Sequence, residues 1–233
     1  MKKALFVIGL ALIASVQANA QFFYGFKGGL NLVDNNITNI NRGNAISPER
    51  YKGFFIGPSA EYHFEEGGVS IELASLFSQK GLAVMSDENV RERALAFPFT
   101  LKYGVGMTNL SVFAQGGVQF NYNIGDLETF IKNTSFTDET KYEVTQFIMD
   151  KSSWSINLGA GARILQRLQL TANYNIPITQ SGTVKVQDNL SEAEAGNLVD
   201  KAETIEDAKA RVKYGFKTKT LQLSLTYYFK SGK

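Results

Sequence analysis

The sequence predicts an all-β fold: an eight-stranded antiparallel up-and-down transmembrane β-barrel with short periplasmic turns and long extracellular loops. The first observation is a series of eight segments, each about ten residues long, in which apolar residues alternate with small or polar ones. This is the length and the period of a strand that crosses a bilayer at a tilt. The second observation is that the links between these segments alternate strictly between short and long, as periplasmic turns and extracellular loops do.

The eight segments follow one another along the chain, and each has one apolar face. In the first, the even positions from Phe22 to Leu32 are mostly apolar, whereas the odd positions include Lys27 and Asn31. Phe55 is an exception to the alternation in the second. The segments are residues 22–32, 53–64, 69–80, 94–103, 110–122, 154–164, 168–178 and 220–229. The short links are 65–68, 104–109 and 165–167, and the long links are 33–52, 81–93, 123–153 and 179–218.

The second face of these segments favours a membrane barrel over a soluble one. A soluble eight-stranded barrel, such as a lipocalin-like fold, would place apolar residues inside and polar residues outside. Here the small and charged residues share one face, on which glycines occur at positions 25, 29, 57, 117, 159 and 161. A narrow lumen suits small side chains, whereas an apolar ligand pocket would need large ones. The mean hydropathy of −0.13 is that of a soluble protein, yet a membrane barrel has a similar average, because only every second strand residue faces lipid.

Residues 1–20 have the pattern of a secretory signal peptide. Lys2 and Lys3 form a charged start, and residues 5–16 form an apolar run that is too short for an ordinary spanning helix. Ala18-Asn19-Ala20 is a cleavage site of small residues, and an uncleaved N-terminal anchor is the alternative. We therefore expect cleavage near Ala20, after which residues 21–233 form one β-barrel domain in the bacterial outer membrane.

The charge and the cysteine content exclude several classes of function. Loss of the leader would leave 22 Lys and Arg against 22 Asp and Glu, so the formal charge of +2 is no argument for nucleic-acid binding. Without Cys there is no disulfide, thiolate metal site or lipid-modified cysteine. The loop carboxylates lack calcium-loop spacing, and neither a phosphate loop nor a zinc motif occurs. We expect no cofactor and no metal.

Charged residues on the inner face form the most informative constellation. If residues 65–68 make a tight hairpin, Glu61 lies opposite Glu72, and Lys27, Lys102 and Arg163 face inward near the same ends of their strands. Two carboxylates and three cations at one depth predict a salt-bridged plug, because unpaired charges in a lumen of low dielectric constant are costly. An ion or proton path is the functional alternative, although side chains just fill an eight-stranded barrel.

Enzymatic interpretations of the inward residues are weaker. Facing carboxylates also fit glycosidase chemistry, but no substrate would reach them through a filled lumen. His63 is the only histidine, and it points inward with Ser70 as its expected cross-strand neighbour. A lipid hydrolase needs a base beside a nucleophile on an accessible surface. We therefore interpret His63 as a hydrogen-bonding residue of the interior or rim, with a catalytic dyad as the alternative, and expect no catalytic residue.

Aromatic residues gather at the strand ends, where amphipathic rings prefer the headgroup interface. They predict an aromatic girdle formed by Tyr24, Tyr62, Phe64, Tyr103, Trp154, Tyr227 and Phe229. Phe229 also fits a terminal signal for the barrel-assembly machinery, although Lys230-Ser231-Gly232-Lys233 follow it.

Two of the long loops have helical patterns. In residues 179–218, apolar residues recur at spacings of three and four: Leu198, Ala202, Ile205, Ala208 and Val212. In residues 123–153, a weaker pattern between Thr137 and Ile148 suggests a second short helix. A structured external loop could bind a partner, or it could only cap the barrel mouth.

Four stretches of the chain are similar to a known family. They are Tyr24-Gly25-Phe26-Lys27-Gly28-Gly29-Leu30-Asn31, Glu72-Leu73 through Ser78-Gln79-Lys80-Gly81, Phe97-Pro98-Phe99-Thr100-Leu101-Lys102-Tyr103, and Leu221 to Phe229. They resemble the first, third, fourth and closing strands of the PorT-like outer-membrane β-barrel proteins of Bacteroidetes, over most of residues 21–229. The resemblance implies the barrel and no chemistry. The named member of that family is linked to a protein-secretion and gliding apparatus.

These observations predict a non-enzymatic outer-membrane barrel with a closed lumen. It would present loops 33–52, 123–153 and 179–218 for interaction, in adhesion, in envelope stability or as an accessory of a secretion complex. The expected partners are outer-membrane lipid and lipopolysaccharide, the barrel-assembly machinery during biogenesis, and a protein bound through the extracellular loops. A small pore or transporter is the first alternative function, and a lipid-modifying outer-membrane enzyme is the second.

Overall fold

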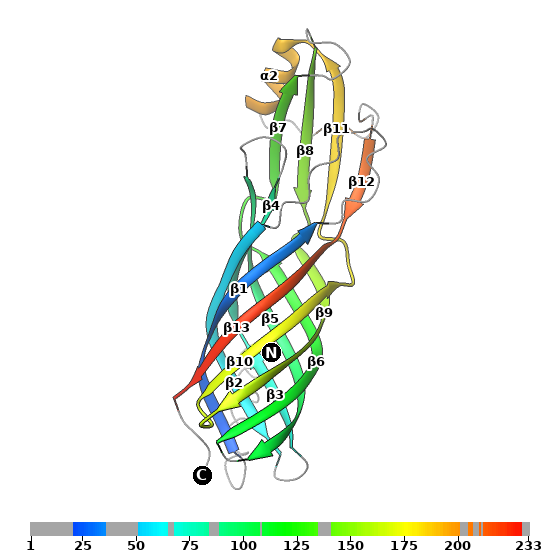
Figure 1. The fold of residues 1–233 in the computed structure, drawn as a ribbon. Coiled ribbons are helices and arrows are strands. Elements are labelled where there is room, and N and C mark those ends of the chain that lie inside the picture. The colour runs from blue at the N-terminus through cyan, green and yellow to red at the C-terminus, as the bar shows by residue number, and fades with distance from the viewer. Residues whose placement is uncertain are drawn as a thin grey trace, which may run out of the picture.

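Eight antiparallel strands close into a barrel in the computed structural model (Figure 1). It describes residues 21–35, 51–64, 68–83, 89–107, 109–134, 141–200, 205–206, 210 and 212–229, so the predicted signal peptide lies outside the described residues. The wall consists of β1 (Gln21–Asn35), β2 (Tyr51–His63), β3 (Val69–Ala74) with β4 (Leu76–Ala83), β5 (Asn89–Met107), β6 (Leu110–Asn123), β9 (Ser152–Ile164), β10 (Leu168–Pro177) and β13 (Thr218–Tyr228). β1 pairs with both β2 and β13, which closes the wall and confirms the predicted fold class.

β3 and β4 are one wall strand with an interruption at Ser75. The pairing register with β2 is the same before and after this residue. Ser75 donates its N–H to the carbonyl of Pro58 at 3.0 Å. Because proline has no N–H, Pro58 cannot return the second hydrogen bond of this pair. The eight-strand count of the sequence therefore holds, although the ladder has a local gap.

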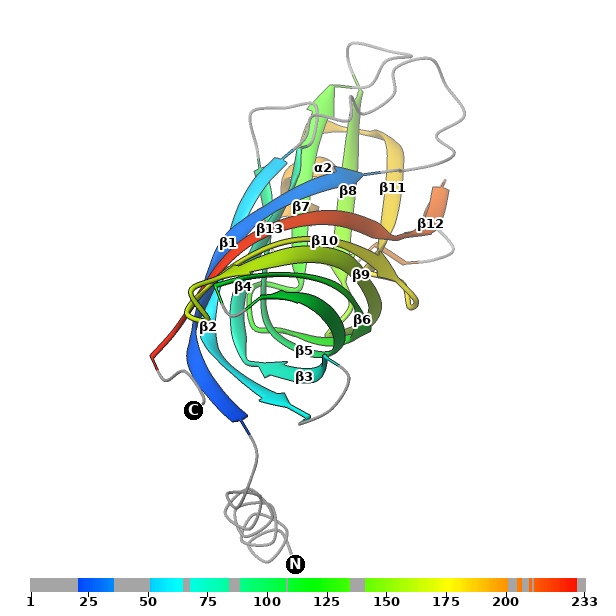
Figure 2. The same cartoon turned by 60° about the horizontal axis from the view of Figure 1, so that its bottom comes forward.

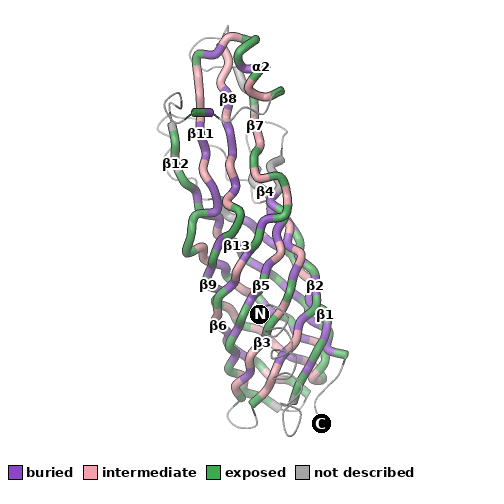
Figure 3. The backbone as a smooth tube through the Cα atoms, turned by 180° about the vertical axis from the view of Figure 1, so that it is seen from behind, coloured by how far each residue is buried: buried purple, intermediate pink, exposed green. Residues whose placement is uncertain are grey.

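The two faces of the wall differ in polarity as predicted. Outward residues such as Leu30 and Leu225 are 51% and 46% exposed, whereas the inward residues Asn31 and Gln169 are fully buried. Figure 3 shows this alternation of buried and exposed residues along the wall strands. The inner face was predicted to carry small and polar side chains, with Phe55 as an exception to the alternation. Large apolar side chains also fill the lumen: Phe23, Phe55, Leu76 and Phe113 are buried.

Glycines on the inner face explain how these rings fit. A Cβ built on Gly29 would lie 2.6 Å from the ring of Phe55, and one on Gly161 would lie 2.5 Å from the ring of Phe113. Each ring therefore occupies the space that the missing side chain leaves. Since an eight-stranded lumen must be filled by side chains, large rings over glycines are a way to fill it.

Four wall strands continue beyond the barrel into a second sheet, the projecting sheet (Figures 1 and 2). It consists of β7 (Glu128–Thr134), β8 (Tyr142–Met149), β11 (Gly182–Leu190) and β12 (Val212–Phe216). β6 leads into β7, β8 into β9, β10 into β11 and β12 into β13, so the neighbour order of the wall is kept. We call this end of the barrel the loop end, and the opposite end, where residues 165–167 join β9 to β10, the turn end.

The projecting sheet has apolar residues on both faces. On one face, α2 (Glu192–Asp200) packs against it, with Val144, Leu190, Ala195 and Ile205 buried together. On the other face, Phe147, Met149, Val184 and Phe216 form a second buried cluster. The sheet is thus a folded element with its own core.

In the part of the chain that the structure describes, no helix is long and apolar enough to cross a membrane.

The helices predicted in the long loops are largely wrong. The helix of the 179–218 loop covers Glu192–Asp200 instead of the Leu198–Val212 pattern, and Val212 begins strand β12. Ala202 and Ala208 lie outside the described residues. In the 123–153 loop, Tyr142–Met149 is strand β8 and not a helix. The cause is that β8 is buried on both faces, so its apolar residues do not alternate and resemble a helical pattern.

Candidate functional site

The carboxylate of Glu61, on β2, is the centre of a buried polar cluster inside the barrel. Its Oε2 accepts hydrogen bonds from Lys102 Nζ at 2.8 Å, Arg163 Nη2 at 2.5 Å and the Tyr228 hydroxyl at 2.6 Å. Its Oε1 accepts one from the Ser70 hydroxyl at 2.9 Å. The side chain has essentially no exposure, so these partners replace the water that the charge has lost.

Glu72, on β3, is the direct cross-strand partner of Glu61, which confirms the pairing derived from the turn. Lys102 Nζ lies between the two carboxylates, because it contacts Glu72 Oε2 as well as Glu61. Lys27, from β1, contacts Glu72 Oε1. Lys102 also donates to Gln169 Oε1 at 3.1 Å. A single buried ammonium thus holds together two carboxylates that would otherwise repel each other.

The guanidinium of Arg163, on β9, combines ion pairing with ring contacts. Besides Glu61, its Nη2 donates to Gln169 Oε1 at 2.7 Å. Its Cζ lies 4.8 Å from the ring centre of Tyr228 and 5.2 Å from that of Phe23. A planar guanidinium donates these hydrogen bonds in its plane and places its flat face on aromatic rings, whereas an ammonium is a point charge without such a face.

The structure brings together all five charged residues that the sequence analysis singled out. With two further residues they form what we call the lumen cluster: Lys27, Glu61, Glu72, Lys102, Arg163, Gln169 and Tyr228. The ring of Phe113, on β6, lies 5.0 Å from Lys102 Nζ. Every wall strand therefore contributes a side chain to the cluster or to its packing. This arrangement can cross-link the whole circumference of the barrel and block its axis.

Gln169 and Tyr228 are the members that the sequence analysis missed. Gln169 stands at an inward position of its segment, but an uncharged amide gave no signal of its own. Tyr228 was hidden in the aromatic run at the end of the closing strand, where its neighbours Tyr227 and Phe229 face outward. The inward parity of Tyr228 in the period of β13 was the signal that could have found it.

His63 lies at the edge of the lumen cluster. Its Nε2 is 2.7 Å from Glu61 Oε1 and 2.6 Å from Arg163 Nη1, and its ring centre is 4.8 Å from that of Phe23. Ser70 is its cross-strand partner, but the Ser70 hydroxyl donates to Glu61. His63 Nε2 is therefore engaged with ion-pairing groups rather than placed to activate this hydroxyl.

Between the lumen cluster and the loop end, amide side chains fill the barrel. Asn157 donates to Gln119 Oε1 at 3.1 Å, and Asn175 donates to Asn157 Oδ1 at 2.6 Å. A small cavity remains, with about 10 Å³ available to the centre of a water molecule, and Lys27 and Gln115 are among its lining residues. This is room for about one water. This cavity therefore has no room for a larger solute in this conformation.

The residues of the predicted girdle face outward at both ends of the barrel. Tyr24, Phe64, Tyr103, Trp154, Tyr227 and Phe229 are exposed, and Tyr62 is half-buried. At the turn end, the ring centre of Phe229 lies 6.1 Å from that of Tyr24 and 5.7 Å from that of Tyr227. At the loop end, the ring centre of Trp154 lies 5.0 Å from that of Phe120.

Among the described residues, no group of His, Asp and Glu side chains is arranged to hold a metal ion.

Comparison with known proteins places these features in a family. Residues 16–182 match the family described as the outer membrane protein beta-barrel domain, and this range extends from the predicted leader to the start of β11. No curated protein sequence matches the chain.

Two solved structures are similar to the chain at a low level. The N-terminal β-barrel domain of OprF from Pseudomonas aeruginosa is 12% identical with a TM-score of 0.37, over 91% of this chain and 98% of that one. An outer membrane channel from Pseudomonas putida F1 is 11% identical with a TM-score of 0.30, over 90% of this chain and 96% of that one. Similarity at this level carries no argument about function.

Proposed function

Because the chain belongs to the family of outer membrane protein β-barrel domains, we propose that it is a non-enzymatic barrel whose projecting sheet binds a protein partner outside the cell. The observation that carries the proposal is the continuity of β6, β9, β10 and β13 with this sheet. A cap over the mouth would need only loops. A sheet with a buried core on each face is instead a rigid surface fixed to the wall.

The proposal orients the barrel with its turn end in the periplasm. Residues 165–167 make a tight connection there, and β1 begins and β13 ends at the same end (Figures 1 and 2). Short turns on the periplasmic side are the rule for outer-membrane barrels. In this proposal residues 1–20 are a signal peptide cleaved near Ala20, and the barrel-assembly machinery inserts the chain.

A PorT-like relationship would concern the barrel wall. The four stretches that resemble the PorT-like proteins of Bacteroidetes fall on β1, on β3 and β4, on β5 and on β13. All of these are wall strands, so the resemblance concerns the barrel and not the projecting sheet. We propose that the chain serves adhesion, envelope stability or a secretion complex through the sheet, and that the wall is the part shared with these proteins.

The closed lumen argues against a small pore as the function. The lumen cluster and the amide side chains leave a cavity for about one water molecule. The polar lining is the observation that favours a pore, since a conducting lumen must be polar. A steady conductance of the purified protein in a planar bilayer, altered by Glu61→Gln or Lys102→Gln, would establish the pore instead.

A lipid-modifying activity would depend on His63. Its contacts with Glu61 and Arg163 inside the barrel favour a role in hydrogen bonding. The decisive assay offers phospholipid and lipopolysaccharide to the purified barrel. Turnover that His63→Ala abolishes, while the barrel stays folded, would replace the proposal with an enzyme.

A trimmed barrel tests the proposal directly. Residues 125–149 and 179–216 are replaced by short turns, which removes the projecting sheet and leaves all wall strands and the lumen cluster. Folding is checked by the mobility of unheated and heated samples in SDS gels. We expect the trimmed barrel to fold and to fail to restore the phenotype of cells that lack the gene. Full restoration by the trimmed barrel would contradict the proposal.

A cross-linking experiment identifies the surface involved. A Cβ at Gly196 in α2 would meet nothing within 4 Å, so a photoreactive amino acid fits there without disturbing the fold. Gly28, on the outer face of the wall, is the matched control position, because a Cβ there has no neighbour closer than 3.7 Å. We expect one protein cross-linked from position 196 in intact cells and none from position 28.

A further inference from the structure

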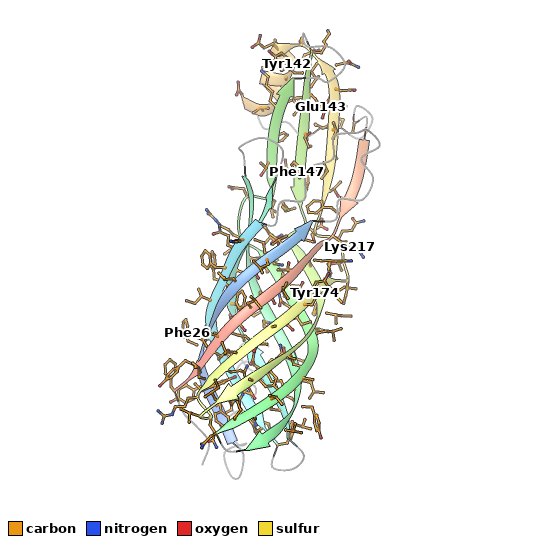
Figure 4. All side chains as sticks on the ribbon, viewed as in Figure 1. Phe26, Tyr142, Glu143, Phe147, Tyr174 and Lys217 are labelled. Atoms are coloured by element: carbon orange, nitrogen blue, oxygen red, sulfur yellow. The ribbon has the colours of Figure 1, made fainter. Side chains whose placement is uncertain are left out.

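A set of cations faces outward where the barrel wall meets the projecting sheet. They are Lys52 on β2, Arg93 on β5, Lys151 before β9, and Lys217 and Lys219 at the start of β13. Four of them are exposed and Lys219 is half-buried. We call them the rim cations. Figure 4 shows Lys217 at this boundary, with Tyr174 and Phe26 on the barrel wall below it.

The rim cations stand at the upper edge of the apolar outer face. On each of their strands, the outward positions toward the turn end carry no charge: Phe54 and Ile56 follow Lys52, Leu95 and Phe97 follow Arg93, and Leu221 and Leu223 follow Lys219. A lysine at such an edge places its stem over the apolar surface and its ammonium in the headgroup layer. With the apolar outer face in the hydrocarbon layer and the loop end outside the cell, as in the proposed function on which this inference rests, the rim cations would lie at the depth of the lipid headgroups.

Two of the rim cations form a pair across one strand. The N–H of Ile124 bonds to the carbonyl of Arg93, and the N–H of Asn123 bonds to the carbonyl of Lys151. Arg93 and Lys151 therefore flank the end of β6 on both sides, roughly 10 Å apart at two strand spacings. Lys151 Nζ lies 5.7 Å from the ring centre of Tyr122, an outward residue, which directs the ammonium away from the lumen.

The rim cations have no carboxylate partner within ion-pair distance in the described part of the chain. The ion pairs of the lumen cluster and His63 involve none of the rim cations. Lys217 Nζ donates only to the carbonyl of Ile178, at 2.9 Å. Acidic residues also occur at this end of the wall: Glu92 precedes Arg93 on β5 but is buried, and Asp126 and Asp150 lie beyond β6 and before β9. None of these three carboxylates forms an ion pair with a rim cation.

We propose that the rim cations bind the phosphate groups of the glycolipid in the outer leaflet, with Arg93 and Lys151 as the principal site. Phosphate accepts hydrogen bonds from a guanidinium in a forked geometry and from an ammonium as a point charge, so the two side chains are complementary. A lipid is favoured over a soluble anion as the source, because the site continues directly into the apolar outer face. Acyl chains on that face and phosphates on the rim would then be bound by one continuous surface.

The test is the binding of diphosphoryl lipid A to the barrel in maltoside detergent, measured by native mass spectrometry. Each cation near an anionic lipid surface contributes about a fivefold effect on affinity, so Arg93→Gln with Lys151→Gln should weaken binding roughly 30-fold. Arg167→Gln removes an exposed cation at the turn end and is the matched control, with no change expected. Heat-dependent mobility in SDS gels shows that each variant is folded.

Two further arms separate the sources of phosphate. Lipid A without phosphates should bind the unsubstituted barrel as weakly as diphosphoryl lipid A binds the double variant. Inorganic pyrophosphate at the same concentration should leave lipid A bound. The proposal is overturned if the double variant binds normally, if Arg167→Gln causes an equal loss, if dephosphorylated lipid A binds equally well, or if pyrophosphate displaces the lipid.

Discussion

Glu61 and Glu72 face each other across β2 and β3, and the ammonium of Lys102 contacts both carboxylates. The predicted consequence is that Lys102→Met strongly destabilises the barrel. It would leave two buried carboxylates side by side without their shared cation, a change that costs about 3–5 kcal/mol of unfolding free energy. Urea unfolding in lipid vesicles measures the effect, with the single tryptophan, Trp154, as a lipid-facing fluorescent probe.

Lys52→Met is the control for this variant. Lys52 is exposed on the outer face, so in vesicles that contain no lipid A or other anionic lipid its loss should change the unfolding free energy by less than about 0.5 kcal/mol. Adding Glu72→Gln to Lys102→Met should recover part of the loss, because the two residues are coupled. Equal stability of Lys102→Met and Lys52→Met would contradict the assignment of Lys102 as the bridging cation.

Arg163→Lys should also be destabilising, although the charge is kept. Arg163 uses one terminal nitrogen for Glu61 and the other for His63, whereas a lysine has a single nitrogen and would lose one of these contacts. A lysine also has no planar face for the rings of Phe23 and Tyr228. Loss of one charge-assisted hydrogen bond lowers the unfolding free energy by about 1.5–3 kcal/mol. The same unfolding experiment measures it, with Arg167→Lys at the exposed turn as the neutral comparison. An unchanged midpoint would show that a point charge is sufficient at this position.

The barrel and the charged part of the lumen cluster could be predicted because both follow from a period of two. An inward position is fixed by parity, and the short 65–68 turn fixes the register of Glu61 against Glu72. The contact between Tyr228 and Glu61 could not be derived in this way. Their strands, β13 and β2, are separated by β1, so the contact depends on the tilt and the diameter of the closed barrel.

The projecting sheet was missed for a different reason. Its strands have apolar residues on both faces, so neighbours such as Phe147 and Ile148 give no alternation. Burial of both faces depends on α2 and on segments distant in the chain. A short apolar run with this ambiguity is assigned to strand or helix only by its tertiary partners.

The proposed plug predicts the behaviour of the barrel in a planar bilayer. The unsubstituted protein should show no steady conductance, because the lumen cluster fills the axis. A combined variant with Ala at positions 61, 72, 102 and 163 should show frequent openings, since four long side chains are removed together. A steady open channel of the unsubstituted protein would overturn the plug. A silent combined variant that is folded would place the constriction in the amide-filled part of the lumen.

The N-terminus of α2 should be sensitive to acid. Ser191 donates its hydroxyl at 2.7 Å and its N–H at 2.9 Å to Glu194 Oε2, an arrangement that caps the helix. The hydrogen bond from the Ser191 hydroxyl, and then that from its N–H, lower the pKa of Glu194 from its ordinary value of 4.5. Since the folded pKa is the lower one, the stabilisation is complete above 4.5 and is lost as the pH falls through the folded value.

Hydrogen exchange of the α2 amides, corrected for intrinsic rates, measures this acid sensitivity. Protection should fall as the pH drops below 4.5, while amides of the barrel wall keep theirs. Glu194→Gln should remove the pH dependence, and Glu192→Gln, in the same helical turn, should retain it. Identical pH profiles for the two variants would show that Glu194 is not the titrating group.

The inner and outer glycines of the wall should respond oppositely to a single methyl group. A Cβ on Gly57 would overlap the backbone carbonyl oxygen of Ser75, because the curved wall brings neighbouring backbones together on its concave face. A Cβ on Gly28, on the outer face, would meet nothing closer than 3.7 Å. Gly57→Ala should therefore impair folding and Gly28→Ala should not, as measured by the yield of heat-modifiable barrel after refolding into detergent. If both variants refold equally, the backbones of the wall are less closely packed on the concave face than the contact between Gly57 and Ser75 implies.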